Sequence, residues 1–285
     1  MKVIITVNEL QNQIREGHLA PVGFVPTMGA LHEGHLSLMK NAVEKCPLVV
    51  VSIYVNPTQF NDKNDLKNYP RTLESDLALL GTVLRATDIV FTPDDNEIYP
   101  EEDTRKFQFG NLDNVMEALH RPGHFNGVAQ VVSRLFEIVK PDIAIFGMKD
   151  FQQLAVIKEL IKQTNNKVKI IAGPIIREND GLAMSSRNRL LEPQIRKHAP
   201  IIYKTLSAAS LMIGKNEILE IKSFVEKSIN NIPGFKIEYF EIVDEFELIP
   251  INKKQEMRSD RQYFGCIAVK AGKIRLIDNI KIELV

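Results

Sequence analysis

Two histidines stand three positions apart in the stretch PTMGALHEGHLSL, residues 26–38. His32 and His35 flank Gly34 at the point where a helical pattern begins. The free backbone N–H groups and the dipole at a helix N-terminus favour an anion, and Gly29 lets the backbone approach a ligand closely. The stretch therefore suits phosphate binding, with the imidazoles donating hydrogen bonds to phosphate oxygens and to charge that develops during transfer.

Two other interpretations of this stretch stay open. A capped helix start with incidental surface histidines accounts for an isolated H-x-x-H without any ligand. A zinc site is disfavoured, because protease-type zinc motifs place two histidines four positions apart on a formed helix. His32 and His35 are only three apart, and a glycine lies between them.

A second stretch, GMKDFQQ, brings a positive charge to another predicted helix start. Asp150 and Gln153 have the spacing of a capping box, with Asp150 as the N-cap residue. Capping does not account for Lys149, because the helix dipole repels a cation there unless an anion lies between them. A phosphate would fit.

The third stretch, DGLAMSSRN, combines small residues with two hydroxyls and a guanidinium. Ser185, Ser186 and Arg187 give it the donors to wrap phosphates. The alternative is an ordinary loop between two domains.

Two further stretches offer groups for a second substrate. In NPTQF, Asn56 and Gln59 are neutral amides that suit a hydroxyl or a carboxylate. In MEALHRPGHFNGV, Arg121 could clamp a carboxylate, but its spacing from Glu117 favours an ion pair on a helix surface. We interpret His124 as a packing or loop residue rather than a catalyst.

The elements that must position these loops follow from hydrophobic patterning. Apolar runs at 22–25, 48–55, 88–91, 142–146 and 167–173 predict strands, and the segments 36–45, 73–85, 127–140 and 151–163 predict the helices between them. This alternation is typical of a doubly wound, parallel α/β sheet, which binds ligands at the carboxyl ends of its strands. Three polar stretches fall at those ends: PTMGALHEGH after the first strand, NPTQF after the second and GMKDFQQ after the fourth.

The chain changes character after Pro174. Helices are predicted at 192–213, which Pro200 should kink or split, and at 217–229. Strands are predicted at 236–243 and 263–278, with KAGK as a hairpin turn. We therefore expect a domain of residues 1–174 and a smaller α+β domain of residues 175–285.

Composition narrows the function classes. Among 285 residues, 36 basic side chains balance 36 acidic ones, which argues against a nucleic-acid partner. The opening MKVIITV is too short for a signal-peptide core, and the longest apolar run, LVVVSIYV, has the length of a strand, so no membrane partner is expected. Cys46 and Cys266 lie far apart without a CxxC partner, as in a protein of the reducing cytoplasm.

Taken together, the stretches resemble a known family. HEGH is similar to the HxGH signature of the nucleotidyltransferase superfamily, and MSSRN is similar to its KMSKS loop. The strings PTMGALHEGHLSL, NPTQF, YPRT, RPGHFNGV, FGMKDFQQL and DGLAMSSRN, in this order, resemble the pantothenate synthetases, also called pantoate–β-alanine ligases.

The resemblance implies a two-step reaction and a fold. ATP and (R)-pantoate would give pantoyl adenylate and pyrophosphate with Mg²⁺, and the amine of β-alanine would then displace AMP to give pantothenate. The fold implied is a Rossmann-like domain with a smaller C-terminal domain that closes over the site, usually in a homodimer.

The resemblance also implies residue roles. His35 matches the proton donor and His32 its partner on the phosphates. Gln59 and Gln153 match the glutamines that hold pantoate, with Gln59 also close to β-alanine, and Asp76 is the candidate for an acidic residue near magnesium. The residues expected to contact ATP are Met28, Gly29, Ala30, Leu31, His32, Glu33, Gly34, His35, Gly147, Met148, Lys149, Asp150, Ile176, Met184, Ser185, Ser186 and Arg187.

Some residues of the GMKDFQQ stretch complicate the resemblance. Met148 departs from the acidic residue that many members have there, and its side chain need not touch substrate. Gln153 cannot fully serve both a capping box and pantoate, and we assign it to pantoate. Lys149 joins the two histidines and the segment Ser185, Ser186 and Arg187 as the groups that hold the triphosphate.

Two rival functions remain. One is another HxGH-type nucleotidyltransferase that ends at the nucleotidyl product. The other is a nucleotide- or RNA-binding module without catalysis, against which the balanced charge and the intact HEGH, GMKD and MSSR loops argue.

Overall fold

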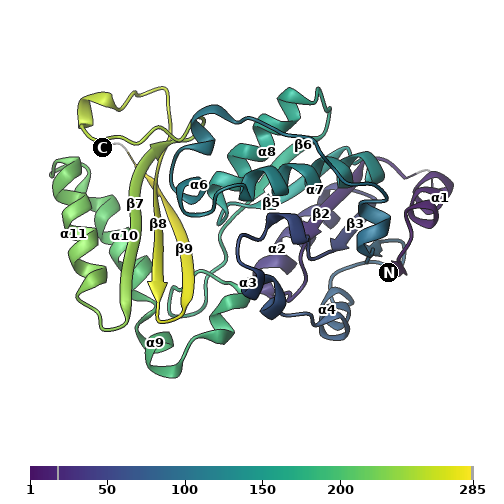
Figure 1. Cartoon of the computed structure of the whole chain (residues 1–285), viewed down its shortest axis with the longest axis horizontal. Coiled ribbons are helices and arrows are strands. Elements are labelled where there is room, and N and C mark those ends of the chain that lie inside the picture. The colour runs from purple at the N-terminus through teal and green to yellow at the C-terminus, as the bar shows by residue number, and fades with distance from the viewer. Residues whose placement is uncertain (18, 284–285) are drawn as a thin grey trace.

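The computed structural model describes residues 1–17 and 19–283 and contains two sheets (Figure 1). The first is a six-stranded parallel sheet in the order β1-β4-β3-β2-β5-β6. Its strands are β1 (Lys2–Ile4), β2 (Val22–Thr27), β3 (Leu48–Ile53), β4 (Ile89–Phe91), β5 (Ile143–Gly147) and β6 (Lys169–Gly173). The predicted α/β class and its five strands are confirmed.

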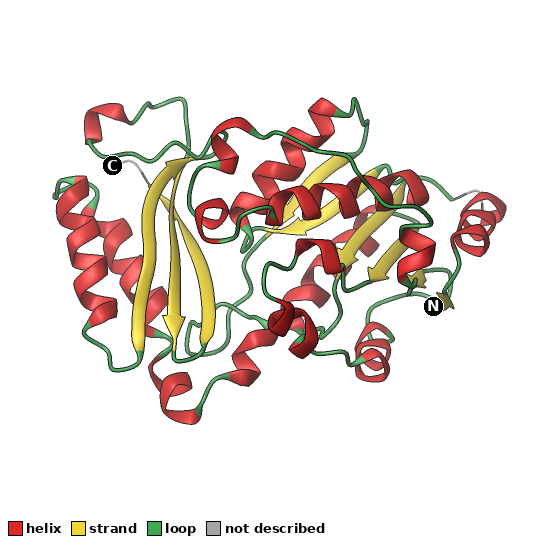
Figure 2. Ribbon diagram, in the orientation of Figure 1, coloured by secondary structure: helices red, strands yellow, loops and turns green. Residues whose placement is uncertain are grey.

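Helices cover both faces of this sheet (Figure 2). Successive residues of β2 face opposite sides: Phe24 belongs to the cluster under α1, α7 and α8, and Val25 to the cluster under α2 and α4. The helices of this part are α1 (Val7–Gly17), α2 (Glu33–Lys45), α3 (Lys63–Asn68), α4 (Leu73–Leu80), α5 (Asp95–Ile98), α6 (Glu117–His120), α7 (His124–Val139) and α8 (Phe151–Gln163), with 3₁₀ turns η1 (Pro57–Gln59) and η2 (Gly110–Asp113).

The strand order reverses beside β2. The chain runs outward from β2 through β3 to β4 and then returns to the other side of β2 as β5 and β6. Both neighbours are parallel to β2, with Gly23 paired to Val49 on one side and to Ile143 on the other. A sheet of this topology has a crevice at the carboxyl ends of the strands where the order reverses.

The second sheet is antiparallel and carries two helices on one face. Its strands are β7 (Phe235–Asp244), β8 (Tyr263–Ala271) and β9 (Ile274–Ile282), and α10 (Ile201–Met212) and α11 (Ile218–Asn230) pack against it. Residues before α10 form η3 (Ser186–Leu190) and α9 (Pro193–His198), and η4 (Lys254–Glu256) follows β7. As predicted, Pro200 separates two helices. We propose the domain boundary near Pro174, which directly follows β6.

The differences from the predicted elements have local causes. The helix predicted at 73–85 is shorter in the structure, because α4 ends at Leu80 with Gly81 as its C-cap residue. Helix α7 begins at His124, three residues earlier than predicted, after Gly123 in the left-handed region. The short β1 and the amphipathic α1 were not predicted. None of the helices in the described part of the chain combines the length and apolarity needed to cross a membrane.

Candidate active site

The three polar loops converge on one cavity of about 220 Å³. It opens at the carboxyl ends of β2 and β5, where the strand order reverses, and the segment leading into η3 closes another side. The predicted site residues that line it are Met28, His32, Gly34, His35, Gln59, Gly147, Lys149, Asp150, Gln153, Ile176, Met184, Ser185, Ser186 and Arg187.

Five residues expected to contact ATP do not line this cavity among the described residues. The side chains of Ala30 and Leu31 are buried, that of Glu33 is exposed, and Met148 packs against the main core. Gly29 lies at a neighbouring hollow instead. In this structure these five residues therefore offer no side-chain contact to a ligand in the cavity.

His32 is the N-cap residue of α2. Its Nδ1 accepts a hydrogen bond from the backbone N–H of Gly34 at 3.1 Å. A Cβ atom on Gly34 would lie 2.8 Å from His32 Cε1, so the glycine leaves room for the ring. The His32 and His35 rings approach with centroids 4.1 Å apart. The two interpretations of this stretch, a capped helix and a phosphate site, therefore apply to the same N-terminus, that of α2.

Both histidines are uncharged at neutral pH. Burial, followed by the charges of His32 and Lys149, lowers the pKa of His35 to about 3, and burial and the Lys149 charge lower the pKa of His32 to about 4. Because His32 Nδ1 accepts a hydrogen bond, the neutral ring carries its proton on Nε2. His35 Nδ1 is buried without a hydrogen-bond partner among the described residues.

Lys149 lies in the turn between β5 and α8. Its ammonium group forms no hydrogen bond or ion pair with any other residue that the structure describes, although it faces the cavity. Asp150 is the N-cap residue of α8, but its exposed side chain makes no capping hydrogen bond. The predicted capping box is therefore wrong, and Gln153 lines the cavity with its amide uncommitted within the described chain.

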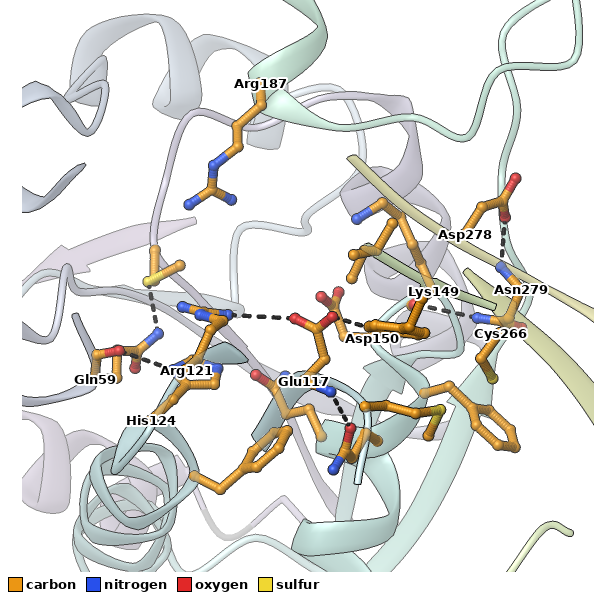
Figure 3. A pocket seen from close by; sticks show the side chains of 18 of the residues that line it. Gln59, Glu117, Arg121, His124, Lys149, Asp150, Arg187, Cys266, Asp278 and Asn279 are labelled. Carbon is orange, nitrogen blue, oxygen red and sulfur yellow. Dashed lines mark hydrogen bonds and ion pairs between the residues drawn. The ribbon is translucent and has the colours of Figure 1, made fainter. Parts of the chain in front are cut away.

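Gln59 is held from two directions (Figure 3). Its Nε2 lies 3.1 Å from Met28 Sδ, and His124 Nδ1–H donates to its backbone oxygen at 2.8 Å. Burial lowers the pKa of His124 to about 4, so this ring is neutral. Helix α7 approaches closely because Gly127 has no side chain: a Cβ there would lie 2.4 Å from the Thr58 oxygen. His124 thus positions Gln59, in line with its interpretation as a packing residue.

Asn56, which was expected to suit a second substrate, lines the cavity and makes hydrogen bonds within the protein. Its amide donates to the oxygens of Gln59 and Gly127, at 3.2 and 3.1 Å, and accepts from the Tyr99 hydroxyl at 3.1 Å. The side chain is buried, and its groups already have partners inside the protein. Asn56 shapes the turn that presents Gln59.

Arg187 reaches the cavity from the segment that leads into η3. Ser185 caps this turn by accepting the N–H of Arg187 at 3.3 Å. The Arg187 guanidinium pairs with Asp65 of α3 at 3.1 Å and lies 5.8 Å from the centre of the Tyr69 ring. The Arg187 guanidinium, which we expected to bind phosphate, is therefore paired with Asp65 in this structure.

Glu117 pairs with Arg121 as expected, but its side chain is buried rather than on a helix surface, and Arg121 is not its main partner. Glu117 accepts two hydrogen bonds from Arg275 of β9, at 2.7 and 2.8 Å, and one from the Tyr239 hydroxyl at 2.7 Å. Arg121 lies farther away, at 3.9 Å. Burial raises the pKa of Glu117, but the hydrogen bonds and charge of Arg275 outweigh burial and hold the pKa below its ordinary value. This pair joins the parts of the chain that carry the two sheets.

Asp76, expected near magnesium, lies beneath the loop that follows β2. Its two oxygens accept the backbone N–H groups of Ala30 and Leu31 at 2.9 and 2.8 Å, and Thr72 donates to it at 3.2 Å. Gly29 and Ala30 both have positive φ, at 76° and 50°. The buried carboxylate therefore holds this strained loop, and it belongs to no group of three or more His, Cys, Asp and Glu side chains in the described residues that could hold a metal ion.

Within the described ranges, no three or more side chains of His, Cys, Asp and Glu come together in a group that could hold a metal ion. The donors around the cavity are instead cationic or neutral N–H groups, which suit anions. The residues present therefore fit phosphate and do not form a magnesium site of their own.

Comparison with known proteins agrees with this geometry. The family model described as pantoate-beta-alanine ligase matches residues 2–281. Pantothenate synthetases of Bacteroides thetaiotaomicron and Azobacteroides pseudotrichonymphae are 48% and 51% identical to the chain, over 99% and 98% of its length and 99% of theirs.

Solved structures extend the likeness to the fold. Pantothenate synthetase from Thermus thermophilus superposes with a TM-score of 0.90 at 40% identity, covering 100% of both chains. Pantoate-beta-alanine ligase from Francisella tularensis, complexed with β-γ ATP and β-alanine, gives 0.80 at 34% identity, over 100% of this chain and 99% of that one. With sequence, fold and cavity in agreement along its length, the chain belongs to the pantoate–β-alanine ligase family.

Proposed function

We propose how the residues of this cavity carry out the family's reaction. That reaction is the ATP-dependent condensation of (R)-pantoate with β-alanine to give pantothenate, AMP and pyrophosphate, and the chain is a ligase that forms a C–N bond. The observation that carries the residue assignment is Lys149: an ammonium group without a partner in the described chain faces the same cavity as the two neutral histidines.

In the first step, a carboxylate oxygen of pantoate attacks the α-phosphorus of ATP. The bond from this phosphorus to the bridging oxygen breaks, and pyrophosphate leaves with the bond electrons. The protein forms no covalent bond here, so it acts by positioning the reactants and stabilising charge. Lys149 would neutralise phosphate charge, while His35 and the Nε2–H of His32 would donate to phosphate oxygens.

The segment before η3 would complete the phosphate site. Ser185, Ser186 and Arg187 line the same cavity as the helix start of α2. For Arg187 to contact phosphate, it must exchange Asp65 for the ligand, which is a modest change because both side chains are partly exposed.

Gln59 and Gln153 would hold pantoate. The proposal is supported by their position: both line the large cavity and also a smaller one of about 80 Å³. In the second step, the amine of β-alanine attacks the acyl carbon of pantoyl adenylate, AMP leaves, and the amine loses a proton. Gln59 would lie beside β-alanine in this step.

Magnesium would enter with the phosphates of ATP, where it supplies charge neutralisation. Asp76 is not assigned to it, because its oxygens face the loop. A homodimer in the cytoplasm is proposed from the family resemblance, and light scattering of the purified protein tests the assembly.

The deciding experiment is mass-spectrometric detection of pantothenate and AMP from ATP, (R)-pantoate and β-alanine, with each substrate omitted in turn. Formation of both products only in the full mixture is the expected result. A lasting nucleotidylated product with another acceptor would instead indicate a transferase that stops at that stage.

A further inference from the structure

The C-terminal sheet reaches the Lys149 turn through one buried side chain. Asn279 of β9 donates its Nδ2–H groups to the backbone oxygens of Met148 and Lys149, at 2.8 and 3.1 Å (Figure 3). Only 3% of Asn279 is exposed. Among the described residues, no other group donates a hydrogen bond to the backbone oxygens of Met148 and Lys149. Backbone N–H groups of Met148 and Asp150 also hold this turn, through the oxygens of Gly173 and Gly147 at 2.8 and 3.3 Å, so Asn279 adds the contact that ties the turn to the other sheet.

The neighbouring residue holds the second phosphate loop. Asp278 accepts a bidentate pair of hydrogen bonds from Arg177, at 2.6 and 3.0 Å, and is itself buried. Arg177 also donates to the oxygens of Gly181 and Asn279, at 3.2 and 3.3 Å, and lies over the Tyr203 ring at 3.6 Å. The loop that continues to the Ser185–Arg187 segment is thereby fixed to β9.

The two contacts are also joined to each other. The backbone N–H of Asn279 donates to Asp278 Oδ1 at 2.8 Å, so the amide and the carboxylate occupy fixed positions on consecutive residues. Two adjacent residues of one strand thus hold two loops that both line the cavity. A shift of β9 would move both loops together.

We infer that Asp278 and Asn279 are positioning residues for adenylation: they set the distance between Lys149 and the segment Ser185–Arg187. This inference rests on the proposed role of those groups in binding ATP. Asn279 acts through the turn that carries Lys149, and Asp278 acts through Arg177. Their chemistry fits the task, since an amide can donate to two carbonyl oxygens and a carboxylate can accept both arms of a guanidinium.

The first test is a double-mutant cycle on the dissociation constant for ATP, measured by calorimetry. Asn279→Ala should weaken ATP binding about tenfold, because residues in one hydrogen-bond network commonly have coupling energies of this size. In the Lys149→Ala background the same change should have less than about a twofold effect, since the group it positions is gone. Equal effects in both backgrounds would overturn the inference.

The matched control is Asn111→Ala. Asn111 Nδ2 also donates across to the C-terminal part of the chain, to the Glu247 oxygen at 2.8 Å, but it is exposed and lies outside the cavity. Its loss should leave ATP binding within about twofold of the parent protein. If Asn111→Ala weakens ATP binding as much as Asn279→Ala, the effect belongs to domain contact in general and the inference fails.

A second variant guards against misfolding. Asn279→Asp keeps the size of the side chain but places an acceptor against two carbonyl oxygens, so it should weaken ATP binding at least as much as Asn279→Ala. Normal ATP binding by Asn279→Asp would contradict the inference even if Asn279→Ala proved unstable. For Asp278→Asn, amide hydrogen exchange should quicken in residues 177–187 and stay unchanged in α11, and the absence of that difference would exclude the role of Asp278.

The outcomes separate this inference from the proposed function. If Lys149→Ala binds ATP normally, the assignment of Lys149 fails and the inference fails with it. If Lys149→Ala binds weakly while both Asn279 variants bind normally, only the inference fails.

Discussion

Arg275 of β9 and Glu117 of α6 form a bidentate ion pair across the two parts of the chain, with N–O distances of 2.7 and 2.8 Å. The Glu117 side chain is largely buried, and the Tyr239 hydroxyl supplies a third hydrogen bond to it. The pair borders the smaller cavity, which Glu117 and Tyr239 both line. One contact therefore joins the C-terminal sheet to the wall of the site.

We predict that Arg275→Ala lowers the free energy of unfolding by about 3 kcal/mol, because removing one partner leaves a buried carboxylate without its main counter-charge. Urea titration followed by circular dichroism measures this. The control is Arg258→Ala, which breaks an exposed pair with Asp260 and should change stability by less than about 1 kcal/mol. Equal losses in the two variants would contradict a special role for the buried pair.

His35→Ala and Lys149→Ala should both fold but release pyrophosphate from ATP and pantoate at least about a hundredfold more slowly than the parent protein, since removing one preorganised donor from developing charge has an effect of this size. A coupled phosphate assay under single-turnover conditions provides the rate. His198→Ala, an exposed change on α9, serves as the control. Near-normal release by a folded variant would remove that residue from the mechanism.

Asp65→Asn should lower the KM for ATP by up to about fivefold. Arg187 would no longer have to leave an ion pair before it meets phosphate, and a partly exposed pair of this kind is worth about 1 kcal/mol or less. Initial rates at saturating pantoate and β-alanine give the KM. Glu44→Gln removes the same charge from the exposed face of α2 and should leave KM unchanged. A raised KM in Asp65→Asn would show that the pair supports ATP binding.

Asp76→Asn should raise the KM for ATP about tenfold, because one of two loop N–H groups would then face an NH₂ group instead of an acceptor. At saturating ATP, the Mg²⁺ concentration for half-maximal rate should stay the same. A shift in that concentration would return Asp76 to the role of a metal ligand. Thr82→Ala, in the exposed turn that follows α4, provides a comparison.

Acid should destabilise the protein as the pH falls below the ordinary histidine pKa of about 6.5 towards about 4. The folded-state pKa of His35 is lowered to about 3 and those of His32 and His124 to about 4, so the unfolded chain binds more protons in this window. The free energy of unfolding then falls as pH decreases, and its loss begins near the unfolded-state pKa.

Urea titrations at several pH values measure this slope. His124→Asn keeps a donor near Nδ1 but cannot take up a proton, so its stability should vary less steeply with pH. The exposed His198→Gln should keep the parent slope. A flat dependence in the parent protein would exclude the histidines as its acid-sensitive groups.

Local signals in the sequence predicted most of the fold and the location of the site. Apolar runs predicted β2 and β5, and Met28 and Lys149 follow these strands within two positions. Because ligands bind at the carboxyl ends of parallel strands, the sequence predicted that both residues lie at one site. The three-residue β1 has too short a pattern to distinguish from a loop.

Distant partnerships were not predictable in this way. Glu117 lies 158 positions from Arg275, whereas Arg121 stands at helical spacing, so the local rule selected the weaker partner. Asp76 lies 46 positions from Ala30, and nothing in its own neighbourhood indicates that it holds a loop. Side chains that act on a backbone far along the chain leave no periodic pattern.

The two residues between the histidines, Glu33 and Gly34, differ in the substitutions that the HxGH signature can tolerate. Glu33 points to solvent, so a saturation library at this codon should return many active clones. Gly34 has no such freedom, because any side chain would begin 2.8 Å from Cε1 and 2.9 Å from Nδ1 of His32. Of the two residues between the histidines, the first would then vary freely and the second would stay glycine, because the His32 ring leaves no room for a side chain at position 34.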